Sequence, residues 1–482
     1  MSASPRSPSR RAFLAGAATG GAAVFAGGVL PRWLFSNDPD RPPALYEFYV
    51  DSFWMDSAGA WQEPVRPPLR GSQKADVAIV GGGFCGMATA YHLASLLPGK
   101  RIVLLEGARC GYGASGRNGG FADPGMPGLG WVYDEFGPEV ARAYWDATAL
   151  GLTQIHAFAS EYDCDLEVNG SLELATDEAH LDDLVAQQRR YQSMGLGAEL
   201  LDRAAVRRAI ASERFVGGLR IPGHAILNPA KLALGMRRAI ESVGVVVSER
   251  SKVLAIEPGH PVRIRTEYAD VEAAKAVIAL NGYAPQIGLF EQRILPLTNY
   301  VCATEPLSAK QREAIGWNGR EGIADTRTEF MYLRPTRDGR IVFGGESAPY
   351  FYGGSPATGV YRPSIERLQK SLLVTFPQLE GVGFTHAWGG TMGFTRDFVP
   401  SIGRLGDADD VFYGVGFCGE GVVMTQLAGM ILARLVAGEE DSLTRLPIVG
   451  RQMPWLGPEP LRSLVVRLTE WALVTLGVNP VR

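Results

Sequence analysis

The chain has 482 residues, of which 46% are hydrophobic and 20% are charged. This composition is typical of a globular protein and excludes a disordered, collagen-like or polytopic membrane chain. The length allows two or three domains. The net charge of −4 excludes a sequence-wide basic surface, so nucleic acid is not an expected partner. The 59 glycines are about 12% of the residues, against a usual ~7%. Such an excess indicates either low-complexity sequence or many special backbone positions.

The five cysteines are scattered along the chain and form no CxxC pair or zinc-like spacing. Neither a metal site nor a disulfide framework is therefore expected.

Residues 1–30 are predicted to be a twin-arginine export signal. Arg10 and Arg11 precede an uncharged Ala/Gly-rich stretch, residues 15–30. A transmembrane anchor is the alternative, but the stretch is weakly apolar and barely long enough to span a membrane. The prediction places the protein in the periplasm or on the extracytoplasmic face, with retention as an uncleaved anchor left open. Because this route carries folded proteins, the signal also points to a cofactor that is bound before export.

Regular structure is expected after a Pro-rich and aromatic segment. Residues 77–80 and 102–105 are predicted as buried strands around a helix over residues 84–97, which is a βαβ beginning. From residue 297 to 345 longer alternating strands predict an antiparallel second domain inserted in the first. The fold class is therefore expected to be mixed α/β (α+β), with a Rossmann-like nucleotide-binding domain and an inserted antiparallel-sheet domain.

The strongest motif is a glycine-rich turn, Gly81-Gly82-Gly83-Phe84-Cys85-Gly86, which fits GxGxxG. It follows a predicted strand and opens a predicted helix, whose N-terminus favours a phosphate. Glu106 stands at the end of the second strand, where an acid accepts hydrogen bonds from a ribose. An acid there disfavours a 2′-phosphate, which leaves FAD and NAD open. A merely structural turn is the alternative, and it leaves Glu106 unexplained.

Residues 107–120, GARCGYGASGRNGG, form a second glycine-rich loop. With this loop the chain resembles the D-amino-acid oxidase and glycine oxidase family of FAD-dependent amine oxidoreductases. The resemblance continues, in family order, through residues 332–345, 395–403 and 416–422. Within the family, the chain is most similar to the gamma-glutamylputrescine oxidoreductase-like proteins, which share its aromatic stretch at residues 45–54.

The resemblance implies FAD as the cofactor and gives the domains their roles. The expected boundaries are 1–30 for the signal, 31–74 for an N-terminal extension, 75–165, 205–290 and 384–445 for the FAD-binding domain, 166–204 and 291–383 for the substrate domain, and 446–482 for a tail with an amphipathic helix. The cofactor-binding residues implied by the motifs are Gly81, Gly83, Phe84, Cys85, Gly86, Glu106, Gly107, Ala114, Ser115, Gly116, Arg117, Asn118, Gly119, Gly120, Val253, Asn281, Gly282, Gly390, Asp397, Gly416, Cys418, Gly419, Glu420, Gly421 and Val422.

The tail helix has two interpretations. Leu461, Leu464, Val465 and neighbouring apolar residues share one face, with Arg462 and Arg467 elsewhere. In the first interpretation this face packs on the body of the protein. In the second interpretation it makes a peripheral membrane contact.

Departures from the family narrow the expected chemistry. Monomeric sarcosine oxidases link the flavin to a cysteine near the position of Gly390, and dimethylglycine dehydrogenases use a histidine near the position of Arg117. Non-covalent FAD is therefore expected. Sarcosine oxidases also place a carboxylate-binding lysine where this chain has Val423, which argues against a simple α-amino acid substrate.

The implied reaction is oxidation of the C–N bond of an amine by hydride transfer to flavin N5, after which water hydrolyses the imine. The candidate catalytic residues are Glu420, His224, Tyr332 and Arg117. Glu420 lies between two glycines and is the candidate for binding a substrate ammonium, with a solvated loop acid as the alternative. His224 is also interpretable as a loop histidine, and Tyr332 as a packed strand residue.

An exported FAD-dependent amine oxidoreductase is thus the leading hypothesis, with a gamma-glutamylated or secondary amine as substrate and oxygen or a quinone as electron acceptor. A D-amino-acid or sarcosine-type enzyme is the second hypothesis. A flavin-binding subunit without turnover is the third. A nicotinamide-dependent dehydrogenase is disfavoured because the sequence contains one βαβ fingerprint.

Overall fold

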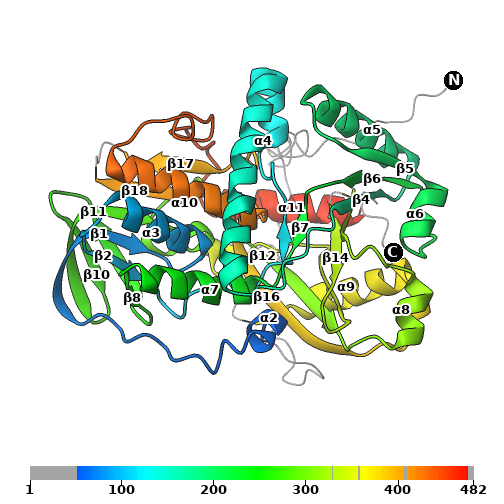
Figure 1. The fold of residues 1–482 in the computed structure, drawn as a ribbon, viewed down its shortest axis with the longest axis horizontal. Helices are drawn as coiled ribbons and strands as arrows, with labels where there is room; N and C mark the ends of the chain where they lie inside the picture. Colours follow the sequence, from blue (N-terminus) through cyan, green and yellow to red (C-terminus); the bar gives the residue numbers. More distant parts are fainter. Residues whose placement is uncertain (1–50, 328, 357–358, 407–409, 476–482) are drawn as a thin grey trace, which may run out of the picture.

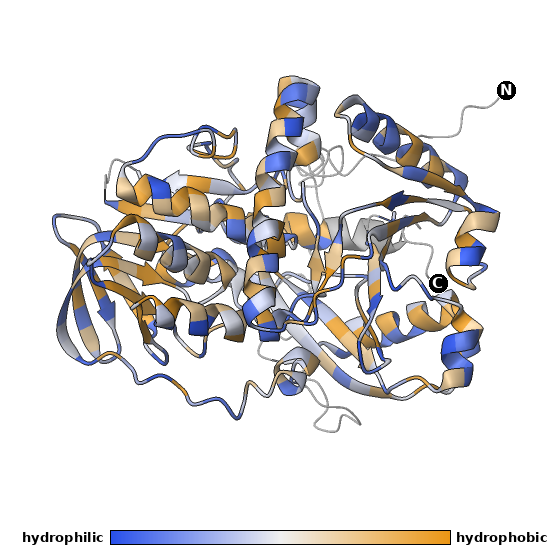
Figure 2. Ribbon diagram, in the orientation of Figure 1, coloured by the Kyte–Doolittle hydropathy of each residue, from blue (hydrophilic) through white to orange (hydrophobic). Residues whose placement is uncertain are grey.

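The computed structural model describes residues 51–475 except 328, 357–358 and 407–409. The predicted export signal and the extension up to residue 50 lie outside the described residues. Two β-sheets lie next to each other and are joined by the long helix α4 (Leu129–Glu161) (Figure 1). Hydrophobic residues line the sheets, and hydrophilic ones gather on the outer faces of helices such as α5 (Glu178–Ser193) (Figure 2).

The first sheet is parallel at its centre, in the order β18, β11, β1, β2, β8. Its strands are β1 (Gly71–Val80), β2 (Ile102–Leu105), β8 (Val246–Ser248), β11 (Ala269–Ile278) and β18 (Val411–Val415), with antiparallel additions β9 (Val253–Glu257), β10 (Val262–Thr266) and β17 (Ser401–Arg404). All four residues of β2 are buried, as expected where a parallel sheet is covered on both faces.

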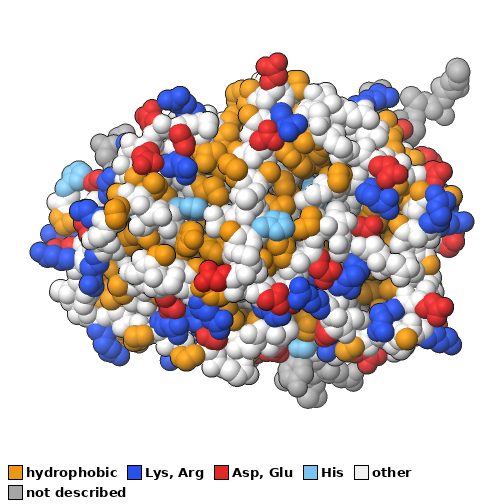
Figure 3. Space-filling model, in the orientation of Figure 1, with side chains coloured by type: hydrophobic (Ala, Val, Ile, Leu, Met, Phe, Trp, Pro, Cys, Tyr) orange, Lys and Arg blue, Asp and Glu red, His pale blue; other side chains and the backbone are white. Residues whose placement is uncertain are grey.

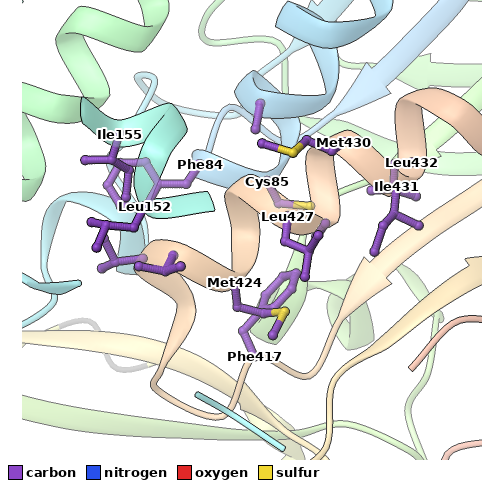
Figure 4. Packing of buried hydrophobic residues seen from close by; sticks show 14 of the residues in the cluster. Phe84, Cys85, Leu152, Ile155, Phe417, Met424, Leu427, Met430, Ile431 and Leu432 are labelled. Carbon is purple, nitrogen blue, oxygen red and sulfur yellow. The ribbon is translucent and has the colours of Figure 1, made fainter. Parts of the chain in front are cut away.

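Helices α3 (Phe84–Leu96), α7 (Pro229–Ser242) and α10 (Gly421–Ala437) form one side of this domain. Helix α10 packs against α3, and it is apolar on nearly every face because it is buried between α3, α4 and the sheet. In this core, Cys85 of α3 lies beside Leu427 of α10, and Phe84 lies near Leu152 and Ile155 of α4 (Figure 4). The β9–β10 ladder supplies Val262 and Ile264 to the core on the other face.

The second sheet has eight strands in the order β16, β12, β15, β14, β13, β4, β6, β5. These strands are β4 (Ser171–Ala175), β5 (Glu199–Asp202), β6 (Gly217–Ile221), β12 (Leu295–Thr304), β13 (Gly322–Asp325), β14 (Met331–Pro335), β15 (Ile341–Gly345) and β16 (Phe384–Phe394). Every pair is antiparallel except β13 with β4. Helices α6 (Arg203–Ala209), α8 (Ala309–Ile315) and α9 (Arg362–Thr375) belong to the same domain. The expected nucleotide-binding domain with an inserted sheet domain is confirmed.

Sheet membership moves two of the expected domain boundaries. Strand β6 pairs with β4 and β5, so the first segment of the second domain extends past residue 204 to residue 221. Strand β16 pairs with β12 along its length, so residues 384–394 belong to the second sheet and not to the FAD-binding domain. Both changes depend on pairings between strands far apart in the chain.

Helix α4 was not expected from the sequence. Gly137, with φ 83°, and Pro138 interrupt it, and these residue types normally end a helix. Beyond this kink, Tyr144, Leu152 and Ile155 are buried on one face at helical spacing.

Helix α2 (Phe53–Ser57) lies between the two domains. Trp54 packs with Ala230 and Leu234 of α7 and with Val301 of β12 in one apolar cluster. The aromatic segment before the first sheet is therefore part of the core.

Among the described residues, no helix is both long and apolar enough to cross a membrane. The five cysteines are free and buried. Charged side chains of both signs are interspersed over the face drawn in Figure 3.

Candidate active site

A cavity of about 1240 Å³ extends from the carboxyl ends of β1 and β2 to the face of the second sheet. Pockets for drug-sized ligands measure roughly 300–1,000 Å³, so this cavity has room for a dinucleotide together with a small substrate. Most of the predicted site residues line it: Gly81, Gly83, Phe84, Cys85, Glu106, Gly107, Ala114, Ser115, Arg117, Asn118, Gly119, Val253, Asn281, Tyr332, Gly390, Asp397, Cys418, Gly419, Glu420, Gly421 and Val422.

The nucleotide end of the cavity is formed by the start of α3. Gly83 has extended backbone at the N-cap and supplies no side-chain cap, and residues 83–85 line the cavity, so the N-terminus of α3 faces a site suited to phosphate. Ser115 of the neighbouring loop places its hydroxyl 2.9 Å from the Phe84 amide, which donates to it. The turn and the loop at residues 107–120 therefore meet at the same point.

Glu106 occupies the position expected of the ribose-binding acid. Its carboxylate accepts hydrogen bonds from the amides of Gly82 at 2.7 Å and Ala108 at 2.8 Å. Burial raises the pKa of Glu106, and these two hydrogen bonds oppose that rise. The carboxyl group is thus fixed at the end of β2 where a ribose hydroxyl would reach it.

Five of the predicted cofactor-binding glycines do not line the cavity. They allow close backbone packing instead, because a Cβ on any of them would overlap a neighbour: Gly86, Gly116, Gly120, Gly282 and Gly416. At Gly86 that neighbour is the carbonyl oxygen of Gly81, which makes Gly86 the contact between α3 and β1.

At the other end, the last glycine-rich loop leads into α10. Glu420 is the N-cap residue of α10, and it lies close enough to Tyr332 for its charge to add to the effect of burial in raising the pKa of that phenol. The Tyr332 hydroxyl donates to Asn299 at 2.8 Å. The structure thus brings an acid and a phenol from different domains to one wall of the cavity.

Arg117 reaches from the glycine-rich loop at residues 107–120 to the second sheet. Its guanidinium donates to the carbonyls of Tyr112 at 2.8 Å and Gly389 at 3.2 Å, and lies 4.6 Å from the Tyr112 ring centre. Asp397 forms an ion pair with Arg451 and accepts from the Val399 amide, so it holds its own turn as well as lining the cavity. Both charged groups therefore line the cavity while their side chains are held by contacts with the protein.

His224 is not brought into the site. It is buried outside the cavity lining, where Nδ1 lies 2.8 Å from the Ser171 hydroxyl and the ring stacks on Trp145. Burial lowers the pKa of His224 to about 4 and raises that of the adjacent Asp123 to about 8, so burial favours the neutral form of both groups despite their separation of 3.3 Å. The expected catalytic role of His224 is therefore not supported. Asp123, which does line the cavity, was missed.

The C-terminal helix α11 (Leu461–Thr475) contributes a wall of the cavity through Val465 and Val466. Arg462, expected on the solvent side, is only 8% exposed and donates to Tyr350, Glu459 and the Glu291 carbonyl. Leu461, expected on the packed face, is 42% exposed. At its first turn the helix therefore buries Arg462, whose charge is satisfied by hydrogen bonds, and not Leu461, whereas Val465 of the predicted apolar face lines the cavity.

Glu459 anchors this helix to the body. Burial alone would raise the pKa of Glu459. Hydrogen bonds from Ser463 and Tyr350, together with the charge of Arg462, hold that pKa below its ordinary value. The sequence pattern predicts the helix, but not that it lines the cavity.

These residues fit FAD. The donor set combines backbone amides at a helix N-terminus, an acid at a strand end and a second glycine-rich loop, in a cavity larger than a nucleotide alone requires. Among the residues described, no group of three or more metal-ligating side chains is present.

Comparison with known proteins also indicates an FAD-binding protein. Residues 76–435 match the family model DAO, described as FAD dependent oxidoreductase. The chain is 33% identical over 407 residues to gamma-glutamylputrescine oxidoreductase of Escherichia coli, covering 82% of this chain and 91% of that protein. It is 30% identical over 414 residues to the probable oxidoreductase OrdL of Haemophilus influenzae, and the match covers 83% of this chain and 91% of that protein. The fold is like that of glycine oxidase from Geobacillus kaustophilus, with a TM-score of 0.67 and 21% identity over 79% of this chain and 100% of that one.

We expect Glu106→Gln to raise the Kd for FAD about fivefold, because a neutral amide replaces charge-assisted hydrogen bonds worth roughly 1 kcal/mol more. Titration of apoprotein with FAD, followed by flavin fluorescence, measures this. Glu257→Gln, which changes an exposed acid of the same domain, is the control and should leave the Kd unchanged. Equal Kd values for the two variants would contradict the assignment.

We expect removal of residues 458–482 to expose bound flavin to solvent, because Val465 and Val466 wall the cavity. Iodide quenching of flavin fluorescence should increase. The double variant Val465→Ala/Val466→Ala should increase quenching without removing the helix, and Leu461→Ala on the outer side should not. Unchanged quenching in the truncated protein would show that α11 does not cover the flavin.

Proposed function

Because the chain belongs to the DAO family of FAD-dependent oxidoreductases, which act on amines or amino acids, we propose that its substrate is a small amine carrying a gamma-glutamyl group or a secondary nitrogen. The observation that carries this proposal is Glu420, an acid at the N-terminus of α10, beside Tyr332 and in the same cavity as the dinucleotide turn. Val423, buried at the position where sarcosine oxidases have a lysine, supplies no positive charge for a substrate α-carboxylate.

Bound FAD supplies the hydride acceptor for the carbon next to the amine nitrogen. The chain positions the substrate and excludes water. Glu420 attracts the ammonium group, and Tyr332, held by Asn299, shapes the wall against which the carbon chain lies. Helix α11 covers part of the cavity, which limits the access of water and favours the neutral amine that releases hydride.

We propose that the FAD is held without a covalent bond. Gly390 and Arg117 stand near the positions at which some members of the family attach flavin through a cysteine or a histidine, and neither residue can form such a link. The acceptor for the reduced flavin is oxygen or a quinone, and peroxide formation by the purified enzyme separates the two.

An anaerobic panel of amines tests the substrate class. Gamma-glutamylated and secondary amines should bleach the oxidised flavin absorbance. Bleaching by D-amino acids or N-methylglycine alone would instead identify the second hypothesis, and no bleaching by any compound would favour a flavin-binding subunit without turnover.

For the best substrate, Glu420→Gln should raise KM about tenfold or more, because an ammonium loses a charged partner. Glu439→Gln, an exposed acid just beyond the same helix, is the control. Unchanged KM and kcat in Glu420→Gln would show that the acid does not bind the amine.

We propose that the chain is exported by the twin-arginine route. Arg10, Arg11 and the uncharged stretch that follows them support this proposal.

We also propose that the outer side of α11 contacts the membrane surface. The exposed side chain of Leu461 supports this second proposal.

We expect the double variant Arg10→Lys/Arg11→Lys to remain in the cytoplasm with its FAD bound. Cell fractionation with flavin fluorescence measures the distribution. Arg6→Lys, which conserves charge in the same segment, should be exported normally. Export of the double variant at the rate of the unmodified chain would contradict the assignment.

A further inference from the structure

Three successive carbonyl groups of the flavin loop, residues 113–120, are held by side chains from outside the loop. The Gly116 carbonyl accepts a hydrogen bond from the Ser52 hydroxyl at 2.9 Å. The Arg117 carbonyl accepts from the Trp388 indole at 2.8 Å, and the Asn118 carbonyl from the Trp54 indole at 2.8 Å.

All three donors are inaccessible to water. Trp54 is 1% exposed, and Trp388 and Ser52 are fully buried. An indole has one N–H with a fixed direction, so each of these bonds fixes the orientation of one peptide plane. Water cannot replace a missing donor at such a site, and a buried carbonyl left without a partner costs about 1–3 kcal/mol.

The orientation of these planes determines where the following amides point. In a trans peptide the C=O and N–H groups point in opposite directions. Because the carbonyls of Arg117 and Asn118 face the two indoles, the amides of Asn118 and Gly119 face the other way. In the part of the chain that the structure describes, neither amide donates to a protein acceptor, and both residues line the cavity.

The donors come from two distant parts of the chain. Trp54 belongs to α2, which precedes the start of the family match at residue 76, whereas Trp388 belongs to β16 of the second sheet. Their rings pack edge to face, 6.5 Å apart, and the Arg334 guanidinium lies 4.9 Å above Trp54. Arg334 itself donates to the Gly120 carbonyl at 3.2 Å, so the far end of the loop is held from the same cluster.

We propose that Trp388 and Trp54 are positioning residues, which turn the Asn118 and Gly119 amides, respectively, toward the bound flavin. Preorganised N–H donors stabilise a group that gains electron density, so this arrangement stabilises the reduced flavin relative to the oxidised one. The proposal rests on FAD binding and is independent of which amine is oxidised.

The test compares indole variants in the FAD-loaded protein. Trp54→Phe and Trp388→Phe each remove one N–H and keep an aromatic ring. Both should lower the reduction potential of the bound flavin, measured by equilibration with a reference dye, and weaken sulfite binding to the oxidised flavin about 5-fold, the effect of losing roughly 1 kcal/mol of hydrogen bonding. Neither measurement uses an amine, so failure of the proposed substrate class leaves this test intact.

Two other tryptophans provide matched controls. The indole nitrogens of Trp61 and Trp317 are buried and donate to no acceptor among the described residues. Trp61→Phe and Trp317→Phe should therefore keep the potential and the sulfite affinity of the unmodified protein.

Benzothienylalanine at position 54 or 388 provides a smaller change if a phenylalanine variant fails to fold, because it replaces the indole N–H by sulfur and keeps the ring size. It should shift both readouts in the same direction. Stoichiometric FAD with unchanged potential and sulfite affinity in Trp54→Phe and Trp388→Phe, or in the benzothienylalanine proteins where those do not fold, would overturn the proposal.

Discussion

The start of helix α3 lies directly on the end of strand β1, and the rest of the site depends on this contact. Gly86 faces the Gly81 carbonyl with no room for a side chain, so the helix begins as soon as the strand ends. This leaves amides at the helix N-terminus facing the cavity, next to Glu106 at the end of β2. Helix α10 then packs on α3 and carries the last glycine-rich loop to the opposite end of the same cavity.

The features that the sequence predicts well are local ones. The glycine turn, the strand before it, the helix after it and Glu106 are contiguous, and each has a physical requirement visible in residue type. The excess of glycine is explained in the same way, since a Cβ at Gly86 or Gly120 would overlap neighbouring backbone. The flavin loop and the loop before α10 were identified by family resemblance, and they line the cavity as expected.

The features that were missed depend on contacts between distant segments. The parallel pair of β13 and β4 and the place of β16 in the second sheet come from pairings that no local pattern encodes. His224 has the chemistry of a catalytic residue, but tertiary packing buries it against Trp145 outside the cavity. Arg462 shows the same limit, because its type predicts solvent exposure while Glu459 and Tyr350 pair with it in the interior.

The two ends of the described chain contribute to the site in different ways. Helix α2 holds the flavin loop from behind, and helix α11 supplies part of the cavity wall through Val465 and Val466. The first of these elements is synthesised before any strand of the nucleotide fold, and the second after all of them. A nascent chain that stops short of residue 465 therefore contains every glycine of the nucleotide site but lacks part of the cavity wall, so the full surroundings of a bound dinucleotide form only once the last helix has been made.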